Sequence, residues 1–391
     1  MKIKLLVLLL VTAFVSRGQE TNRNNAAQKL MSKTDEKLTI GGYAQIDYNQ
    51  PYESQVQRNG KLDVHRMVLL FGYNFSDRTQ FVTELEIEHV VEVYVEQAWL
   101  NHRIANGLNF RSGLMLVPMG IINEYHEPTT FNGVERPNVD NVIVPTTWRE
   151  IGAGFNGYLQ DLGLNYQVYL LNGFNGYNGS AKLSGSSGLR SGRQKGAESY
   201  VSSPNLAIKA DVTSIPGLRL GISGYFGNTQ STLYNGVKHA DTQAKMRADS
   251  SSVEITMLGL DGQYNIGKFD FRAQYILASL TNTGAYNQFT GSDVGSALQG
   301  WYIETAYRIY LGNDEANYFF TPFVRFENYN THFKVDESIV QNDAFNRTDI
   351  TLGTSFQLSS GAVLKADYQL FGNAASNTYK GQLNLGIGIW F

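Results

Sequence analysis

Residues 81–88 decide the fold class, and they read Phe-Val-Thr-Glu-Leu-Glu-Ile-Glu. Successive side chains of a β-strand point to opposite faces, so Glu84, Glu86 and Glu88 share one face while the intervening leucine and isoleucine share the other. Unpaired carboxylates in a sealed apolar core cost several kcal/mol each. We therefore expect the acidic face to meet water and the apolar face to meet hydrocarbon.

The same period-two alternation recurs from residue 38 to the C-terminus, and no stretch reads as a long amphipathic helix. Lys209 and Asp211, for example, oppose Ile208 and Ala210. The mean hydropathy of −0.26 suits a barrel, because a barrel hides half of its side chains from lipid. We expect about sixteen strands, an even number as in bacterial barrels, at residues 38–48, 63–75, 79–88, 93–103, 108–117, 149–158, 163–173, 204–212, 217–227, 254–265, 268–279, 300–311, 317–328, 347–358, 361–371 and 379–391.

Tight and long connections alternate between these strands, and one connection, at 89–92, is shorter than its place in the series predicts. Short periplasmic turns and long extracellular loops are typical of outer-membrane barrels. A soluble propeller or sandwich is the competing all-β fold, but it would bury the acidic strand face between sheets. We predict an all-β protein, a transmembrane antiparallel β-barrel. Its long loops fall at 118–148, 174–203, 228–253 and 280–299.

The N-terminus has the features of an export signal. Lys2 and Lys4 precede an apolar run that is too short to span a bilayer, and small residues follow it. We expect a cleaved signal peptide at 1–18, a polar, flexible or loosely helical lead-in at 19–37, and the barrel at 38–391. This organisation places the protein in the outer membrane of a Gram-negative bacterium.

Composition and motifs exclude several function classes. Cysteine is absent, which excludes disulfides, thiolate metal sites and thiol nucleophiles. The net charge of −3 includes the basic residues of the signal peptide, so the mature chain is mildly acidic and nucleic acid is not an expected partner. No P-loop, dinucleotide fingerprint, HExxH or nucleophile elbow is present, and the six histidines lack metal-ligand spacing. We expect no catalytic residues, metal or cofactor.

Two long loops differ in character. Residues 118–148 contain prolines and aromatic residues, which argue for order, and we expect this third external loop to fold into the barrel and narrow it. A packed surface loop is the alternative. Residues 175–203 are rich in glycine and serine, so we expect a mobile loop. Its basic residues fit a solvated surface better than an anion site.

Charged residues on the inner wall and on the third loop are candidates for lining the pore. Opposed charges near a constriction create a transverse field that favours polar solutes over apolar ones. The signs are mixed, so the set by itself predicts no strong ion preference. The candidates are Arg66, Glu84, Glu86, Glu88, Arg111, Glu124, His126, Glu127, Glu135, Arg136, Arg149, Lys209, Arg219, Arg272 and Arg325.

Several motifs resemble those of the phosphate-selective porin O and P family. They are the strand end at 111–120 (RSGLMLVPMG), the run 148–154 (WREIGAG), the run 169–173 (YLLNG) and the terminal Phe391. The resemblance implies a homotrimer of sixteen-stranded barrels with the third loop folded inward. It also implies anion selectivity from an arginine ladder and a lysine cluster. Lysines form no visible cluster here, and the candidate rungs are Arg66, Arg111, Arg219, Arg272 and Arg325.

The function expected from these observations is passive diffusion of small polar solutes or ions, including anions such as phosphate, through a water-filled lumen. The expected partners are the lipid bilayer, two further copies of the chain and, through Phe391, the outer-membrane assembly machinery. Two alternatives stay open. One is a barrel hydrolase whose serine or aspartate meets a histidine only in space, and the other is a closed surface-binding or secretion-associated barrel.

Overall fold

The structure is a computed structural model that describes residues 25–31, 36–312 and 318–391. The expected signal peptide at 1–18 lies outside these residues. None of the described helices is long and apolar enough to cross a bilayer.

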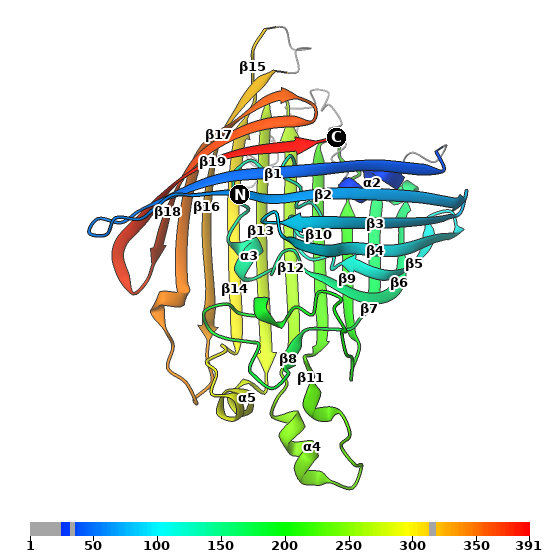
Figure 1. Cartoon of the computed structure of the whole chain (residues 1–391), viewed down its shortest axis with the longest axis vertical. Coiled ribbons are helices and arrows are strands. Elements are labelled where there is room, and N and C mark those ends of the chain that lie inside the picture. Colours follow the sequence, from blue (N-terminus) through cyan, green and yellow to red (C-terminus); the bar gives the residue numbers. More distant parts are fainter. Residues whose placement is uncertain (1–24, 32–35, 313–317) are drawn as a thin grey trace, which may run out of the picture.

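The described strands form one closed antiparallel barrel (Figure 1). Its first strand, β1 (Leu38–Tyr52), pairs with its last, β19 (Ser376–Trp390), and every other barrel strand pairs with its neighbours along the chain. This closure confirms the predicted all-β barrel of sixteen strands. The other fourteen barrel strands are β2 (Lys61–Ser76), β3 (Thr79–Glu88), β4 (Glu92–Ala105), β5 (Leu108–Leu116), β6 (Arg149–Leu159), β7 (Leu164–Leu171), β9 (Asn205–Val212), β10 (Leu218–Asn228), β12 (Glu254–Ile266), β13 (Phe269–Thr281), β14 (Ala297–Tyr307), β16 (Phe319–Lys334), β17 (Asn346–Ser359) and β18 (Ala362–Asn373).

Each predicted strand has a counterpart, and the largest difference concerns β16. This strand continues to Lys334 instead of ending near residue 328, because Asn330 and Lys334 still pair with β14. Short elements occupy the connections. They are α2 (Ala26–Met31), α3 (Val139–Val142), α4 (Thr242–Asp249), α5 (Thr283–Thr290), the strands β8 (Asn175–Tyr177), β11 (Gln230–Ser231) and β15 (Ile309–Tyr310), and the 3-10 turns η1 (Gln160–Leu162), η2 (Arg190–Gly192), η3 (Thr232–Tyr234) and η4 (Asp343–Phe345).

The alternation of side chains separates an apolar outer face from a charged inner face. Phe269 and Phe271 are 46% and 42% exposed, whereas Asp270 and Arg272 between and beside them are 2% and 4% exposed. Two of the three glutamates that decided the fold, at positions 84 and 86, are each 1% exposed inside the barrel. The predicted assignment of the two faces is therefore confirmed for these strands.

Aromatic rings gather on the outer face near the short turns. Phe320 stacks on Phe356 with ring centroids 4.5 Å apart, and Phe269 lies 4.7 Å from Tyr307. Rings with one apolar and one wet side settle at the depth of lipid headgroups. A band of this kind is typical of outer-membrane barrels.

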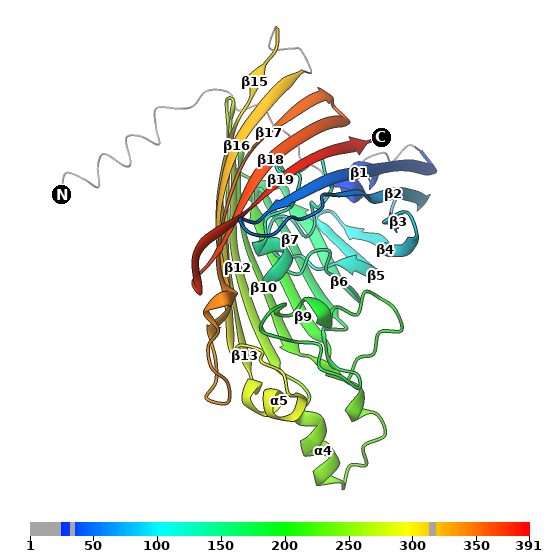
Figure 2. The same ribbon diagram turned by 60° about the vertical axis from the view of Figure 1, so that its left-hand side comes forward.

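Short and long connections lie at opposite ends of the barrel (Figure 2). The long connections carry α4 and α5 at the lower end in the figure, which we call the loop side, and the upper end is the turn side. Two loop-side connections are short, at 89–91 and 374–375. The first is a true tight turn, with His89 and Val90 at positive φ, so the short connection that the sequence predicts there is real.

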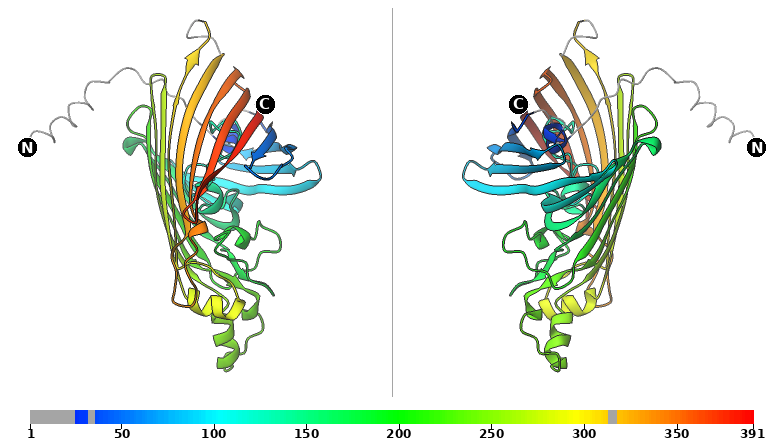
Figure 3. Two further views of the ribbon diagram at one scale, coloured as in Figure 1. Left: turned by 90° about the vertical axis from the view of Figure 1, so that its left-hand side faces the viewer. Right: turned by 90° about the vertical axis from the view of Figure 1, so that its right-hand side faces the viewer.

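The strands differ in slope around the wall. The strands from β1 to β5 are strongly tilted away from the long axis of the molecule, whereas β12 to β14 run nearly along it (Figures 1 and 3). The strands also differ in length, since β7 and β9 each have 8 residues and β16 has 16.

Candidate functional site

The connection between β5 and β6, residues 117–148, lies inside the barrel, and we call it the inward loop. Val117, Met119 and Val139 are fully shielded from solvent, and Ile143 and Trp148 are too. This confirms the prediction that the third external loop folds inward. The alternative of a packed surface loop is wrong.

Lysines of the wall hold the backbone of the inward loop. Lys209 Nζ donates to the carbonyl of Gly120 at 2.7 Å. Lys365 Nζ donates to the carbonyls of Phe131 at 2.6 Å and Gly133 at 2.8 Å. Buried carbonyls need such partners, because an unpaired one is costly. These ammonium groups therefore position the loop.

A chain of ion pairs runs along the wall formed by β13, β14 and β16. Arg272 Nε lies 3.3 Å from Asp270 and 3.8 Å from Glu304. Arg325 Nη1 lies 3.2 Å from Glu304, and its Nε lies 2.9 Å from Glu327. Both arginines also donate to carbonyls of the inward loop. Each guanidinium is thus balanced by carboxylates and by backbone oxygens.

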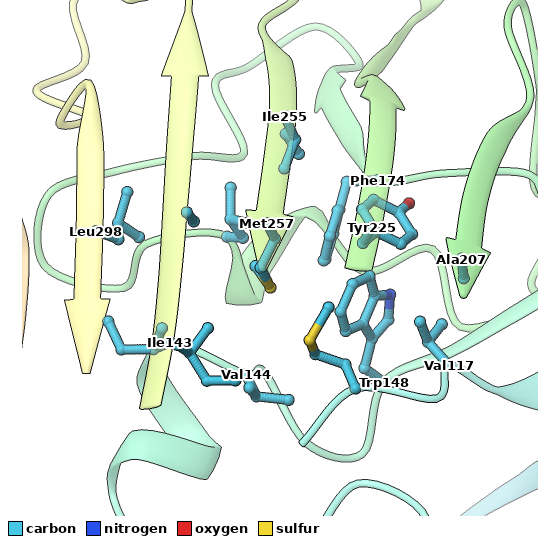
Figure 4. Close-up of a cluster of buried hydrophobic side chains, with 14 of the residues drawn as sticks. Val117, Ile143, Val144, Trp148, Phe174, Ala207, Tyr225, Ile255, Met257 and Leu298 are labelled. Carbon is cyan, nitrogen blue, oxygen red and sulfur yellow. The ribbon is translucent and has the colours of Figure 1, made fainter. Parts of the chain in front are cut away.

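An apolar core fills the lumen between the inward loop and the wall from β9 to β14 (Figure 4). Trp148 stacks on Phe174 with centroids 4.5 Å apart and packs against Tyr225. Ile255 and Met257 of β12 belong to the same core. Their side chains point into the lumen, where polar side chains were expected. The expectation of a wet inner face is therefore wrong in this region, because the loop supplies apolar partners to the inward side chains.

The connection between β7 and β9, residues 172–204, packs over the inward loop. Leu183 and Leu189 are fully buried. Arg190 donates to the carbonyls of Asn141 and Thr146, and Arg193 donates to the carbonyls of Pro145 and Thr147. The expected mobile loop is in the structure a packed one. Its arginines bind backbone oxygens of the inward loop.

The helix α2 also lies in the lumen, against the inner faces of β1, β2 and β3. Ala26 and Ala27 are buried, and Ala26 packs with Tyr43, Val68 and Leu70. Residues 26–31 of the lead-in are therefore helical and lie inside the barrel.

The described residues enclose three cavities in the lumen. A loop-side cavity of about 330 Å³ is lined by Arg66 and by Glu135 and Arg136 of the inward loop. Two turn-side cavities, of about 360 and 220 Å³, are lined by the stretch 129–132 and by Glu124, respectively. The inward loop contributes to all three, so it stands between the two mouths of the barrel.

The structure places the sequence-derived candidates on the inner wall or on the inward loop, and it brings one group of them together. This group gathers where β2, β3 and β4 meet the inward loop, and it also contains Tyr43 and Glu96, which the sequence analysis missed. Both positions look like ordinary strand residues in the sequence. Glu96 is the extra residue of a bulge in β4, because Glu84 pairs with Gln97 and Leu85 pairs with Val95, and no sequence signal marks this bulge. The members from the candidate set are Arg66, Glu84, Glu86, Glu88, His126 and Arg149.

The other candidates lie apart from this group. Arg111 covers the ring of Trp99 at 4.0 Å, and Arg219 pairs with Asp211 at 2.8 Å. Arg66, Arg272 and Arg325 also have carboxylate partners, at 3.5, 3.3 and 2.9 Å, so the arginine ladder that the resemblance implies is not shown. Of the loop carboxylates, Glu124 pairs with Lys209, Glu127 accepts from the amide of Ala26, and Glu135 accepts from Asn49.

Comparison with known proteins gives the fold and little more. No family model matches the chain. A protein of Aquifex aeolicus (strain VF5), described only as uncharacterized, is 29% identical over 347 residues, which are 85% of this chain and 75% of that protein.

Solved structures match nearly the whole barrel at low sequence identity. The outer membrane channel DcaP of Acinetobacter baumannii has a TM-score of 0.59 at 11% identity, over 90% of this chain and 97% of that one. An anion-selective porin from Comamonas acidovorans has a TM-score of 0.55 at 12% identity, over 90% and 99%. In-vitro folded OmpT of Vibrio cholerae, solved in a trimer form, has a TM-score of 0.52 at 11% identity, over 90% and 99%. The chain therefore has the closed barrel fold of these proteins.

Proposed function

We propose that the chain is an outer-membrane channel through which small polar solutes diffuse passively. The observation that carries this proposal is that the loop-side cavity and the larger turn-side cavity lie on either side of the inward loop. Both have charged linings and lie inside a closed barrel with an apolar exterior. Water-filled barrels with a narrowed lumen conduct polar solutes and exclude apolar ones.

The cavity walls support a mild preference for anions. Lys29, Arg272, Arg308 and Lys365 line the larger turn-side cavity, where Asp270 is the acidic residue. The loop-side cavity is also basic on balance, with Arg66, Arg136 and Arg190 against Glu135 and Asp140. Phosphate and other small oxyanions are thus candidate solutes.

Planar-bilayer recording of the purified full chain tests the proposal. We expect discrete single-channel steps and, in a potassium chloride gradient, a reversal potential displaced toward that of chloride. Adding phosphate should reduce the chloride current if the two anions share the path. Absence of steps under all conditions would contradict the channel itself.

Substitutions separate charge preference from general damage. Arg136→Gln should move the reversal potential toward the cation value, because it removes a positive charge from the loop-side cavity. Lys238→Gln is the matched control, since Lys238 is exposed on an external connection and lines none of the three cavities. Equal shifts in both variants would show that the cavity charge does not set the preference.

Location and assembly belong to the same proposal. The apolar outer face and its aromatic band support insertion into the outer membrane after cleavage of the signal peptide at 1–18. Phe391, exposed at 57%, is the proposed contact for the assembly machinery. Exposed aliphatic side chains on the outer face of β6 and β7, Ile151 and Leu170, support a homotrimer. Leu170→Arg should therefore dissociate the trimer, which light scattering would record as a fall in molecular mass. Leu385→Arg, on the outer face of β19, should leave the mass unchanged.

A closed barrel is the second candidate, because loops and α2 fill much of the lumen. A conductance that stays at zero in the full chain and appears on truncation of α2 would favour it. The hydrolase alternative gains a His–Asp pair at the rim, with His89 Nδ1 2.6 Å from Asp63. Among the described residues, however, no serine or threonine hydroxyl hydrogen-bonds His89, so this pair has no nucleophile.

A further inference from the structure

Three potential metal-ligating side chains meet inside the barrel, and they come from three separate segments. Glu84 projects inward from β3, Glu96 projects inward from the neighbouring strand β4, and His126 reaches them from the inward loop. Their ligand atoms all lie within 4.8 Å of one another. All three side chains are at least 98% buried.

The Tyr43 hydroxyl completes a group of four donor atoms. It lies 2.8 Å from Glu84 Oε1, 3.0 Å from His126 Nε2 and 3.5 Å from Glu96 Oε2. His126 Nε2 is 3.3 Å from Glu96 Oε2. Tetrahedral zinc binds nitrogen and oxygen ligands at about 2.0–2.1 Å, which separates neighbouring ligand atoms by roughly 3.3 Å. The four separations given above, 2.8 to 3.5 Å, bracket this value and therefore suit a single small ion.

Residues outside the group orient these ligands. The Nδ1 atom of His126 lies 3.0 Å from the carbonyl of Asn123, which leaves Nε2 directed at the two glutamates. Gln97 donates to the second oxygen of Glu84 at 2.6 Å. Metal-binding histidines commonly donate their other nitrogen to a carbonyl, and ligating carboxylates commonly accept outer hydrogen bonds.

A buried carboxylate oxygen at this place lacks a hydrogen bond. Glu96 is completely shielded from solvent, and its Oε1 atom has no hydrogen-bond partner among the described residues. Arg149 Nη1 lies 3.7 Å from this oxygen. Two buried carboxylates held side by side repel each other unless a proton or a cation lies between them. A divalent ion shared by Glu84 and Glu96 removes this repulsion.

We propose that Glu84, Glu96, His126 and Tyr43 bind one divalent transition-metal ion, with zinc as the best match to one imidazole and three oxygen ligands. The ion joins the inward loop to β3 and β4. It thereby fixes the position of the loop that separates the loop-side cavity from the turn-side cavities. This proposal does not depend on which solute crosses the barrel.

Metal analysis of the full chain tests this site directly. The protein, without a histidine tag, is stripped of metal with EDTA and incubated with zinc. Unbound zinc is removed by gel filtration, and the bound zinc is measured by inductively coupled plasma mass spectrometry. We expect one zinc per chain, and a cobalt-loaded sample should show the visible absorption of a tetrahedral site. A zinc content no higher than that of the blank would overturn the proposal.

Matched variants locate the ion. His126→Asn and Glu96→Gln should each lose most of the bound zinc. His332→Asn should retain it, since His332 is equally buried but contacts a backbone carbonyl and a backbone amide. Glu84→Gln provides a third test if His126→Asn fails to fold. Retention of zinc in all ligand variants would place the ion elsewhere, and it would leave the conductance experiment unaffected.

Discussion

The backbone amide of Ala26, in the N-terminal helix α2, donates a hydrogen bond to the carboxylate of Glu127 in the inward loop. Two segments far apart in the chain therefore meet inside the barrel. Lys29 of the same helix lies over the ring of Trp390 at 4.2 Å. The helix thus touches the inward loop and the strand that closes the barrel.

Removing this helix should widen the turn side of the lumen. We expect a chain lacking residues 19–31 to insert normally and to show a larger single-channel conductance than the full mature chain, because α2 lines both turn-side cavities. Glu127→Gln should give a smaller increase, since it weakens one contact of the helix. Identical conductance in the truncated and full chains would show that the helix does not obstruct the path.

Trp148 should be a major contributor to the stability of the inward loop. It is fully buried, stacks on Phe174 and donates to Glu150 at 2.8 Å. Trp148→Ala should lower the free energy of unfolding by about 3–5 kcal/mol in urea titrations. Trp301→Ala is the control, because Trp301 is only half-buried and belongs to β14 outside this core. A loss no larger than that of the control would contradict the packed core.

Lys365 should hold the middle of the inward loop in place. Lys365→Met leaves the carbonyls of Phe131 and Gly133 without their donor, which costs about 1–3 kcal/mol per buried group. We expect faster proteolysis within 128–134 and noisier single-channel currents. Lys380→Met, at a side chain that is 66% exposed, should leave both unchanged. Equal protection in the two variants would argue against this anchoring role.

Asp140, in α3 of the inward loop, should make stability depend on pH. The pKa of Asp140 is raised to about 8, mainly by burial. The hydrogen bond from Gln274 and the charge of Arg325 oppose this increase, and the charges of Glu327 and Asp261 add to it. A raised pKa means that the folded state binds the proton more tightly than the unfolded state. The contribution of Asp140 to the free energy of unfolding is fully present below about pH 4 and is lost as the pH rises through about 8.

The test compares melting temperatures at pH 5 and pH 9. The natural chain should melt at a lower temperature at pH 9, and Asp140→Asn should show a smaller difference, because asparagine keeps the contact with Gln274 and does not ionise. Asp336→Asn, on an external loop, should leave the difference in place. If Asp140→Asn keeps the full difference, the titrating group lies elsewhere.

Strand positions and facing were predictable because they are local properties. Alternation with period two follows from backbone geometry, so Asp270 and Arg272 could be assigned to the inside without knowledge of the fold. The short connection at 89–91 was also visible in the sequence. The packing of 172–204 was not predictable. Its glycine and serine content indicates only that the isolated segment is flexible, whereas Leu183 and Leu189 become buried by packing against the inward loop.

The sequence by itself determined the alternating strands, an inner face with charges and a third loop of unusual length. Only the tertiary structure decided which charges face each other. Glu84 and Glu96 become neighbours through strand pairing, and His126 joins them because its loop turns inward. The physical reason is that alternation is encoded between adjacent residues, whereas the contacts of a filled lumen depend on closure of the sheet and on where each loop finds buried partners.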